Sequence, residues 1–302
     1  MLEMLLPVAL GIGLPLVLSL AGLWFSWRRS PSRTQALDTF DPFRAGLLSA
    51  VLLGVVLTLG VVSGAARPHF PPTSSLDWPV HFAWLGGLVG VVGALLATSR
   101  PQAPPRRAGL AVFLLLHVFL AGLVLGTMRH ALSGAHAGVA WATALGVSLV
   151  GAGISLAWRA AATHPGPIVP LLVVLVGTTS ALSTVLTGNI GSPMLYGTMC
   201  ACVGPAFLVG LRRPGLVLAG ALTGPAWLLS GLCVVTTVYG ETPWWCAGLN
   251  ALAAIMVYLS GVGALGRAQT WRVWLVRGVM VGVPGVASVV VALLNQPEPY
   301  VS

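Results

Sequence analysis

Hydroxyl side chains gather in one apolar stretch, residues 168–187, where they could line a path for a small neutral solute. Ser180, Thr184 and Thr187 follow i, i+4, i+7 spacing, which places them on one face of a helix. Serine and threonine also bond to carbonyls of their own helix or hold neighbouring helices together, so a purely structural role stays open. The predicted substrate path comprises Ser180, Ser183, Thr184, Thr187, Asn189 and, from later in the chain, Asn250.

His117 is the one ionisable residue that lies well inside a long apolar stretch. Ionisable groups within a membrane are costly and indicate a pathway or a ligand site, so we add His117 to the predicted path. A neutral imidazole that bonds across a bundle is the structural alternative. No Asp, Glu or Lys lies at a similar depth. Because ion-coupled transporters use buried carboxylates, this pattern argues against a proton- or sodium-driven pump.

Histidines also gather near the predicted ends of apolar stretches. Asp77 and His81 are four residues apart and therefore share a helical face. Two imidazoles from facing helices can ligate haem, and a carboxylate can orient such a ligand. This hypothesis requires haem or a transition metal as cofactor, whereas the alternative makes these residues ordinary interface side chains. The candidate metal or haem ligands are His69, Asp77, His81, His130 and His136.

Prolines interrupt several apolar stretches and form a third group of candidates. Proline lacks the N–H of the helical ladder and frees the carbonyl four residues before it. Broken helices mark substrate sites and hinges in many transporters, although isolated kinks are also common in membrane bundles. We therefore predict hinges at Pro205, Pro225 and Pro284.

The composition of the chain indicates whether these residues lie in a soluble protein or in a membrane protein. Of 302 residues, 57% are hydrophobic and 7% are charged, and the mean hydropathy is +0.93. Soluble domains carry about 25% charged residues, so both a soluble globular protein and a disordered one are excluded. The net charge is +9, and all of the 15 basic residues that produce it are arginines. In a membrane protein we interpret this charge as topology, and we expect no nucleic-acid partner.

Ten stretches are long enough to cross a bilayer as helices, which need about 20 apolar residues. The predicted fold is all-α: a polytopic membrane protein forming a single bundle over residues 1–302, with no soluble domain. The stretches are 4–27, 43–65, 78–99, 108–130, 137–158, 168–187, 194–211, 214–238, 244–266 and 273–294.

Arginine predicts the orientation of this bundle. Thirteen arginines fall in alternate connections and only Arg67 and Arg129 fall on the opposite side. The positive-inside rule makes the first side cytoplasmic, so both termini are expected outside. Nine tryptophans near predicted helix ends fit an aromatic belt: Trp24, Trp27, Trp78, Trp141, Trp158, Trp244, Trp245, Trp271 and Trp274. We expect the cell's inner (cytoplasmic) membrane, with the lipid bilayer as the main partner.

Small residues and arginines recur along the chain. Gly-xxx-Gly pairs allow helix backbones to approach closely. Similar Arg spacing in the first and last four helices would fit a repeat of helices 1–4 and 7–10, although any regular bundle places arginine in this way. The glycine pairs are Gly86/Gly90, Gly122/Gly126 and Gly278/Gly282.

These observations favour a permease-like transporter of a small neutral or hydrophobic solute. If the protein is such a transporter, we expect a cavity near Ser183, Pro225 and Asn250. Two alternatives remain: a non-catalytic subunit or assembly factor within a larger membrane complex, and a haem- or metal-binding membrane protein. No hydrolase, protease or phosphate-binding motif is present, so the sequence does not predict an enzyme. A disulfide between Cys233 and Cys246 stays open.

Overall fold

The protein is described from a computed structural model, which is helical throughout its ordered elements. The structure describes residues 6–28, 42–64, 72, 74, 77–98, 107–128, 137–189, 191–240, 242–262, 265 and 270–296. Within these ranges the chain forms ten helices that run through the bundle, which confirms the predicted all-α membrane bundle. Seven of them are long and apolar enough to cross a membrane, and three apolar helices are shorter.

The first crossing helix spans Leu6–Trp27 and contains a π-helical turn, η1 (Ala9–Gly13), followed by α2 (Leu14–Trp27). A short 3-10 turn, η3 (Ala219–Leu222), leads directly into α10. The remaining helices are α3 (Pro42–Gly64), α4 (Trp78–Thr98), α5 (Arg107–Thr127), α7 (Ala137–Ala161), α8 (Ile168–Leu186), α9 (Gly191–Arg212), α10 (Thr223–Val238), α11 (Trp244–Leu259) and α13 (Trp271–Leu294).

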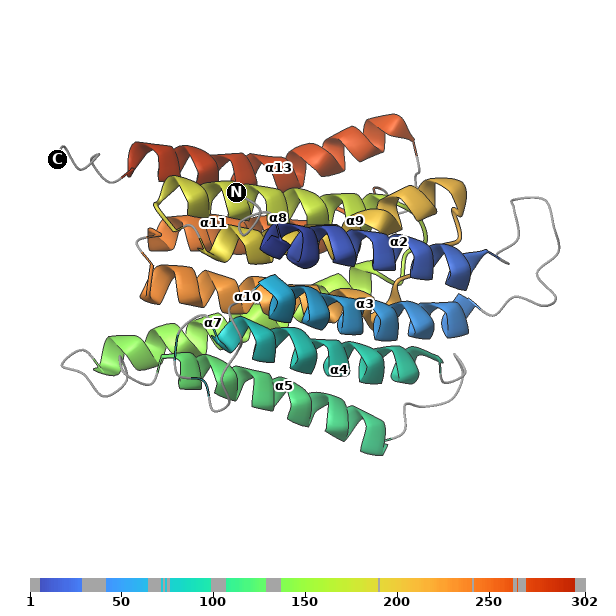
Figure 1. The fold of residues 1–302 in the computed structure, drawn as a ribbon, viewed down its shortest axis with the longest axis horizontal. Helices are drawn as coiled ribbons and strands as arrows, with labels where there is room; N and C mark the ends of the chain where they lie inside the picture. The colour runs from blue at the N-terminus through green and yellow to red at the C-terminus, as the bar shows by residue number, and fades with distance from the viewer. Residues whose placement is uncertain are drawn as a thin grey trace.

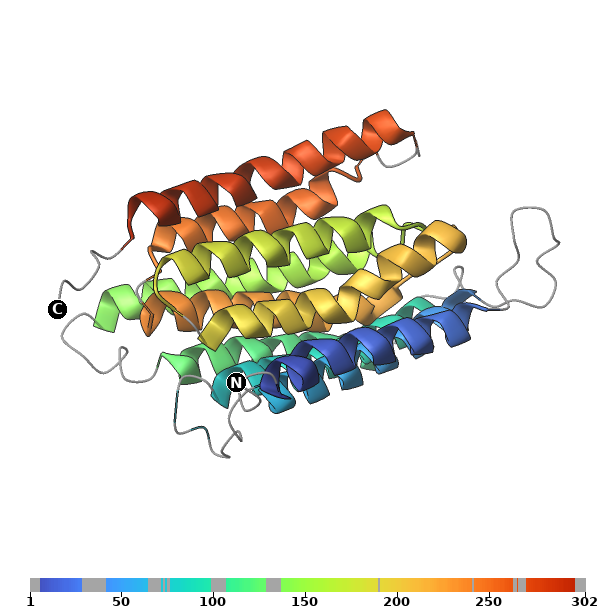
Figure 2. The ribbon, with the colours of Figure 1, turned by 45° about the horizontal axis from the view of Figure 1, so that its top comes forward.

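The helices run side by side along the longest axis of the molecule, with α13 at one edge and α5 at the other (Figure 1). α10 lies in the middle, packed against α4 and α7, and α13 stays at one edge of the bundle after rotation (Figure 2). Of the 16 residues of α10, 13 are buried, whereas only four of the 14 residues of α2 are: Pro15, Ser19, Leu23 and Trp27. α10 is therefore the central helix, enclosed by protein, while α2 faces mainly lipid.

A close approach of backbones places α10 against α4. A Cβ on Gly90 would lie 2.5 Å from the carbonyl oxygen of Gly220, and one on Gly86 would lie 3.0 Å from the Cα of Gly224. Only glycine fits at such distances. The expected close packing is confirmed for the Gly86/Gly90 pair. It is wrong for Gly122 and Gly278, since a Cβ there would meet no atom within 4 Å.

The predicted helix over 214–238 is shorter than expected, and this corrects its boundary. Residues 213–218 form a non-helical segment in which Leu216 and Leu218 are buried. This segment pairs with the α7–α8 connection: Leu218 N–H donates to the Ala162 carbonyl (3.2 Å), and Gly166 N–H donates to the Leu216 carbonyl (3.0 Å). Pro225 is the third residue of α10, where no ladder N–H is required, so it starts the helix and does not interrupt it.

Proline also explains a contact between the first helix and α9. Pro15 cannot donate the ladder bond to the Gly11 carbonyl, four residues before it. The Thr198 hydroxyl donates to this carbonyl at 2.7 Å. Pro15 and Thr198 also flank Gly60 of α3, where a Cβ would lie 2.6 Å from both side chains. Three helices therefore meet at a carbonyl that proline has left without its usual donor.

Two of the tryptophans predicted for the interfacial belt lie inside the bundle. Trp27 and Trp158 are fully buried, and their indole N–H groups donate to Ser49 Oγ (3.0 Å) and the Ala254 carbonyl (2.8 Å). Neighbouring helices cover the ends of α2 and α7 where these tryptophans lie, so the two indoles pack inside the bundle and do not face the membrane interface. Trp24, Trp141, Trp244, Trp245 and Trp271 are exposed, as a belt requires.

Candidate functional site

A cavity of about 500 Å³ opens on the side of the bundle between α7, α10 and α11. It lies in the half of the bundle that contains the start of α7 and α11 and the end of α10, which the arginine pattern assigns to the outside. Its wall is almost entirely apolar. We call it the lateral crevice; it is lined by Thr143, Gly146, Val147, Val150, Gly151, Ile154, Leu229, Ser230, Cys233, Val234, Thr237, Val238, Trp244, Ala247, Gly248 and Ala251.

Small residues create the lateral crevice. A Cβ on Gly146 of α7 or on Gly248 of α11 would meet no atom within 4 Å, and both residues are exposed. Larger side chains at these two positions would occupy the open space. The crevice is therefore open because α7 and α11 each carry a glycine, which has no side chain, at this point. Trp244, which is 62% exposed, forms its outer edge.

Behind the lateral crevice lies a buried group of polar side chains, and Cys233 belongs to both. The Cys233 thiol lies 3.8 Å from the hydroxyl of Tyr196, which is 1% exposed. The Thr184 and Thr236 side chains lie near the same hydroxyl. The contacts place a hydroxyl-rich interior, drawn from α8, α9 and α10, directly behind an apolar entrance.

Most of the predicted path residues belong to this interior. Asn250 Nδ2 donates to Ser183 Oγ at 3.2 Å, and the hydroxyls of Thr187 and Thr242 lie 2.9 Å apart. Ser183, Thr184 and Thr187 also donate to carbonyls of α8 itself. Within this interior, two buried oxygens have no hydrogen-bond partner among the described residues: Ser180 Oγ and Asn250 Oδ1.

Asn189 and His117 lie apart from this group. Asn189 Oδ1 accepts from Ser192 N–H (3.2 Å) at the start of α9, as a capping side chain does. His117 lies between α5, α7 and α10, where its ring nitrogens bond the Phe113 carbonyl (3.0 Å) and Ser155 Oγ (3.2 Å). Its ring also contacts that of the buried Trp227 at 5.9 Å between centroids.

The cavity expected near Ser183, Pro225 and Asn250 is not the one that forms the site. Ser183 and Asn250 are 0% and 2% exposed and bond each other, and neither they nor Pro225 line the lateral crevice. The open volume lies one layer further out, on the other side of Cys233 and Ser230. Packing of hydroxyls against their own helix leaves little room between them.

Only part of the predicted histidine cluster lies within the described residues. His81 Nδ1 accepts from Trp84 Nε1 at 3.1 Å, and Asp77 accepts from Ser74 N–H at 2.8 Å, so both side chains have structural partners. His69, His130 and His136 lie outside the described residues. Among those that are described, no three histidine, cysteine, aspartate or glutamate side chains gather into a group able to hold a metal ion.

The remaining candidates have definite positions. Pro205 and Pro284 lie inside α9 and α13, where each interrupts the ladder, and the predicted hinges stay predictions. All four cysteines are free thiols, with Cys246 bonded to the Ser288 carbonyl at 3.5 Å instead of to Cys233.

Sequence reasoning missed the residues that shape the entrance. Nothing in a single sequence distinguishes a glycine that borders a cavity from one that faces lipid, so Gly146 and Gly248 are not predicted. Tyr196 is not predicted either. Cys233 was considered only for a disulfide. The one available signal was the small-residue run Ala247-Gly248 after the paired tryptophans Trp244 and Trp245.

No protein family matches this chain, and no curated protein is similar enough to count as a relative. The chain is a multi-pass helical membrane protein with an apolar crevice on its side and a buried group of polar side chains behind it.

Proposed function

We propose that this protein is a permease-like transporter of a small neutral or hydrophobic solute, located in the cell's inner membrane. The observation that carries the proposal is the lateral crevice, which opens toward the hydrocarbon and ends at Cys233, beside the Tyr196 hydroxyl. A hydrophobic solute would enter from the bilayer, and a hydroxyl or carbonyl group on it would find donors and acceptors in the interior.

The charges around this site support a neutral solute. Among the described residues, no arginine, aspartate or glutamate lines the lateral crevice, and the polar lining consists of Thr143, Ser230, Cys233 and Thr237. A charged solute would lose its hydration without gaining a counter-charge, which is very unfavourable at membrane depth. Two buried oxygens without described partners, on Ser180 and Asn250, are further candidates to bond a polar group of the solute.

The proposal is tested with proteoliposomes and a neutral amphiphile, radiolabelled octyl glucoside below its micellar concentration. Its sugar slows unaided crossing, while its chain suits the lateral crevice. We expect the protein to accelerate uptake over protein-free vesicles. Gly146→Leu and Gly248→Leu fill the crevice without touching another atom at Cβ, so they should return uptake to the protein-free rate.

Gly153→Leu is the matched control, because Gly153 is an exposed residue of the same helix, its Cβ would also meet nothing within 4 Å, and it does not line the crevice. A diazirine-bearing fatty alcohol, photolysed in the same vesicles, should label α7, α10 and α11 in the wild type and in Gly153→Leu only. If uptake equals that of empty vesicles and labelling is spread evenly over the lipid-facing helices, the proposal is wrong.

A further inference from the structure

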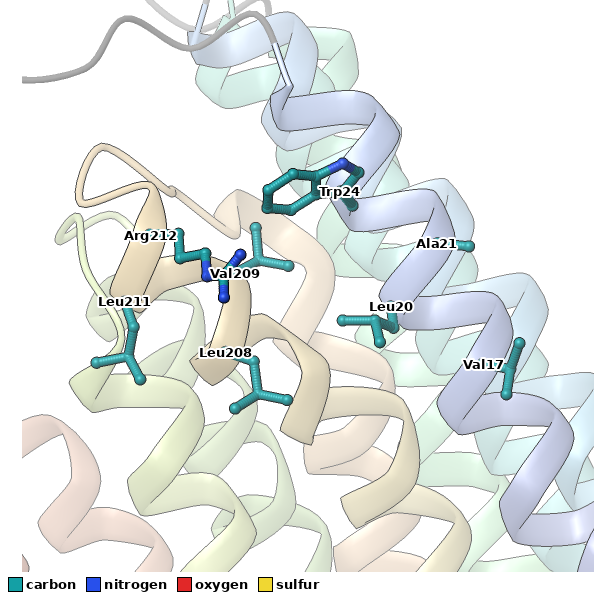
Figure 3. Close-up of a pocket in the computed structure, with 8 residues that line it drawn as sticks. All are labelled: Val17, Leu20, Ala21, Trp24, Leu208, Val209, Leu211 and Arg212. Carbon is teal, nitrogen blue, oxygen red and sulfur yellow. The ribbon is translucent and has the colours of Figure 1, made fainter.

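A second cavity, about 690 Å³ in volume, lies between α2 and α9 at the opposite end of the bundle. We call it the inner groove; Figure 3 shows its lining residues Val17, Leu20, Ala21, Trp24, Leu208, Val209, Leu211 and Arg212. Six of the eight are apolar aliphatic side chains, and the seventh and eighth are a tryptophan and an arginine at one end. The groove thus combines a hydrocarbon-like wall with a cationic end.

The inner groove lies beyond the close contacts that the start of the first crossing helix makes with α9. In the outer half Thr198 bonds the Gly11 carbonyl, and a Cβ on Gly197 would lie 3.0 Å from Ile12. Beyond Pro205, which interrupts the α9 ladder, the groove opens between α2 and α9. Its walls face lipid: Val17, Leu208 and Leu211 are each more than half exposed.

Cations concentrate at the cytoplasmic end of the inner groove. The exposed Arg212 side chain extends toward α2 in Figure 3, and the Arg213 guanidinium lies 5.6 Å from the Trp24 ring centroid. Arg28, also exposed, ends the first helix on the same side. Among the described residues the one carboxylate is Asp77, which precedes α4 at the other end of the bundle.

We propose that the inner groove binds one anionic phospholipid of the cytoplasmic leaflet. An acyl chain lies along Val17, Leu20 and Leu208, and the phosphate is held by Arg212, with Arg213 close by. Charge complementarity selects this occupant: a neutral lipid or a protein helix would fill the apolar wall equally well but would bring no negative charge to Arg212. Basic pockets between helices on the cytoplasmic side suit anionic headgroups in this way.

The proposal is tested by native mass spectrometry of the intact protein in mild detergent, titrated with dioleoyl phosphatidylglycerol and, separately, dioleoyl phosphatidylcholine. We expect the wild type to bind phosphatidylglycerol more tightly. Arg212→Gln should weaken phosphatidylglycerol binding about fivefold and leave phosphatidylcholine binding unchanged, because one arginine near the surface contributes roughly that factor. Leu208→Trp should weaken both lipids by filling the groove without a change of charge.

Arg272→Gln is the matched control: Arg272 is exposed at the cytoplasmic end of α13 and also lies beside a tryptophan, 5.8 Å from the Trp271 ring centroid, but lines no part of the inner groove. It should bind phosphatidylglycerol as the wild type does. Equal wild-type affinity for the two lipids, an equal loss in Arg272→Gln, or displacement of the lipid by inorganic phosphate alone would each overturn the proposal.

Discussion

At the scale of single residues, the interior of this protein shows how polar groups are accommodated where water is absent. Serine and threonine hydroxyls bond carbonyls of their own helices, as Thr184 does with Ser180 (2.7 Å). Proline creates the exceptions, and a hydroxyl from another helix then supplies the missing donor, as Thr198 does for Gly11. Other polar side chains bond directly between helices, as Asn250 does with Ser183 (3.2 Å) and His117 with Ser155 (3.2 Å).

This pairing gives a prediction for Thr198→Val, which keeps the side-chain shape and removes the hydroxyl. We expect a loss of about 1 kcal/mol in the free energy of unfolding, typical of an interhelical hydrogen bond in a membrane protein. In a Pro15→Ala background, residue 15 can donate to the Gly11 carbonyl itself, so the loss should be smaller. Unfolding in a denaturing detergent measures both values; an equal loss in the two backgrounds would contradict the pairing.

The candidate site could be predicted only in part from the sequence. Helical spacing was enough to bring Ser180, Thr184 and Thr187 to one face, and the structure buries that face. Spacing along one helix does not say which helices face each other, so the contact between Tyr196 of α9 and Cys233 of α10 could not be foreseen. Tertiary neighbours also decide whether a polar face encloses open volume, and here the open volume lies beside it.

At the scale of helices, glycine decides which neighbours pack most closely. The pair Gly86/Gly90 faces the backbone of η3 and α10, whereas Gly122, in an identical pattern on α5, faces open space. The pattern alone therefore indicates where close packing is allowed. The presence of a partner depends on the fold, which is why one pair met the expectation and others did not.

Gly90→Ala and Gly122→Ala form a matched pair of substitutions that tests this difference. In Gly90→Ala the new Cβ lies against the carbonyl oxygen of Gly220. This oxygen belongs to the backbone, so it cannot move aside as a flexible side chain could. We expect Gly90→Ala to reduce the free energy of unfolding by about 2–3 kcal/mol, the range for overpacked sites. Gly122→Ala should be neutral or slightly stabilising, since alanine favours helix. Similar values for both variants would show that the close approach is absent.

At the scale of the whole molecule, the described arginines all lie toward one end of the bundle. Arg28, Arg159 and Arg212 lie at the ends of α2, α7 and α9, and Arg272 and Arg277 at the start of α13. Helix number and approximate ends were predictable because hydrophobic length is a local property. The non-helical segment 213–218 was not, since its stability depends on hydrogen bonds to a different connection.

The orientation of the bundle can be tested by labelling single cysteines in intact cells. Thr163 and Asn295 are both exposed and lie at opposite ends of the bundle. With 13 of 15 arginines on the side of Thr163, we expect Asn295→Cys to react with a membrane-impermeant maleimide from outside. Thr163→Cys should react only after permeabilisation. The wild type, with its own four cysteines, measures the background, and the reverse pattern would invert the topology.

The enclosure of α10 has a consequence for how the protein is made. The chain emerges from the ribosome in order, so seven helices are in the membrane before α10 arrives, and two more follow it. The partners of α10 on α3, α4 and α7 precede it and must assemble around a position that is not yet filled. Biogenesis therefore requires either a temporary occupant of that position, such as lipid or an insertion chaperone, or late closure of α4 and α7 around α10.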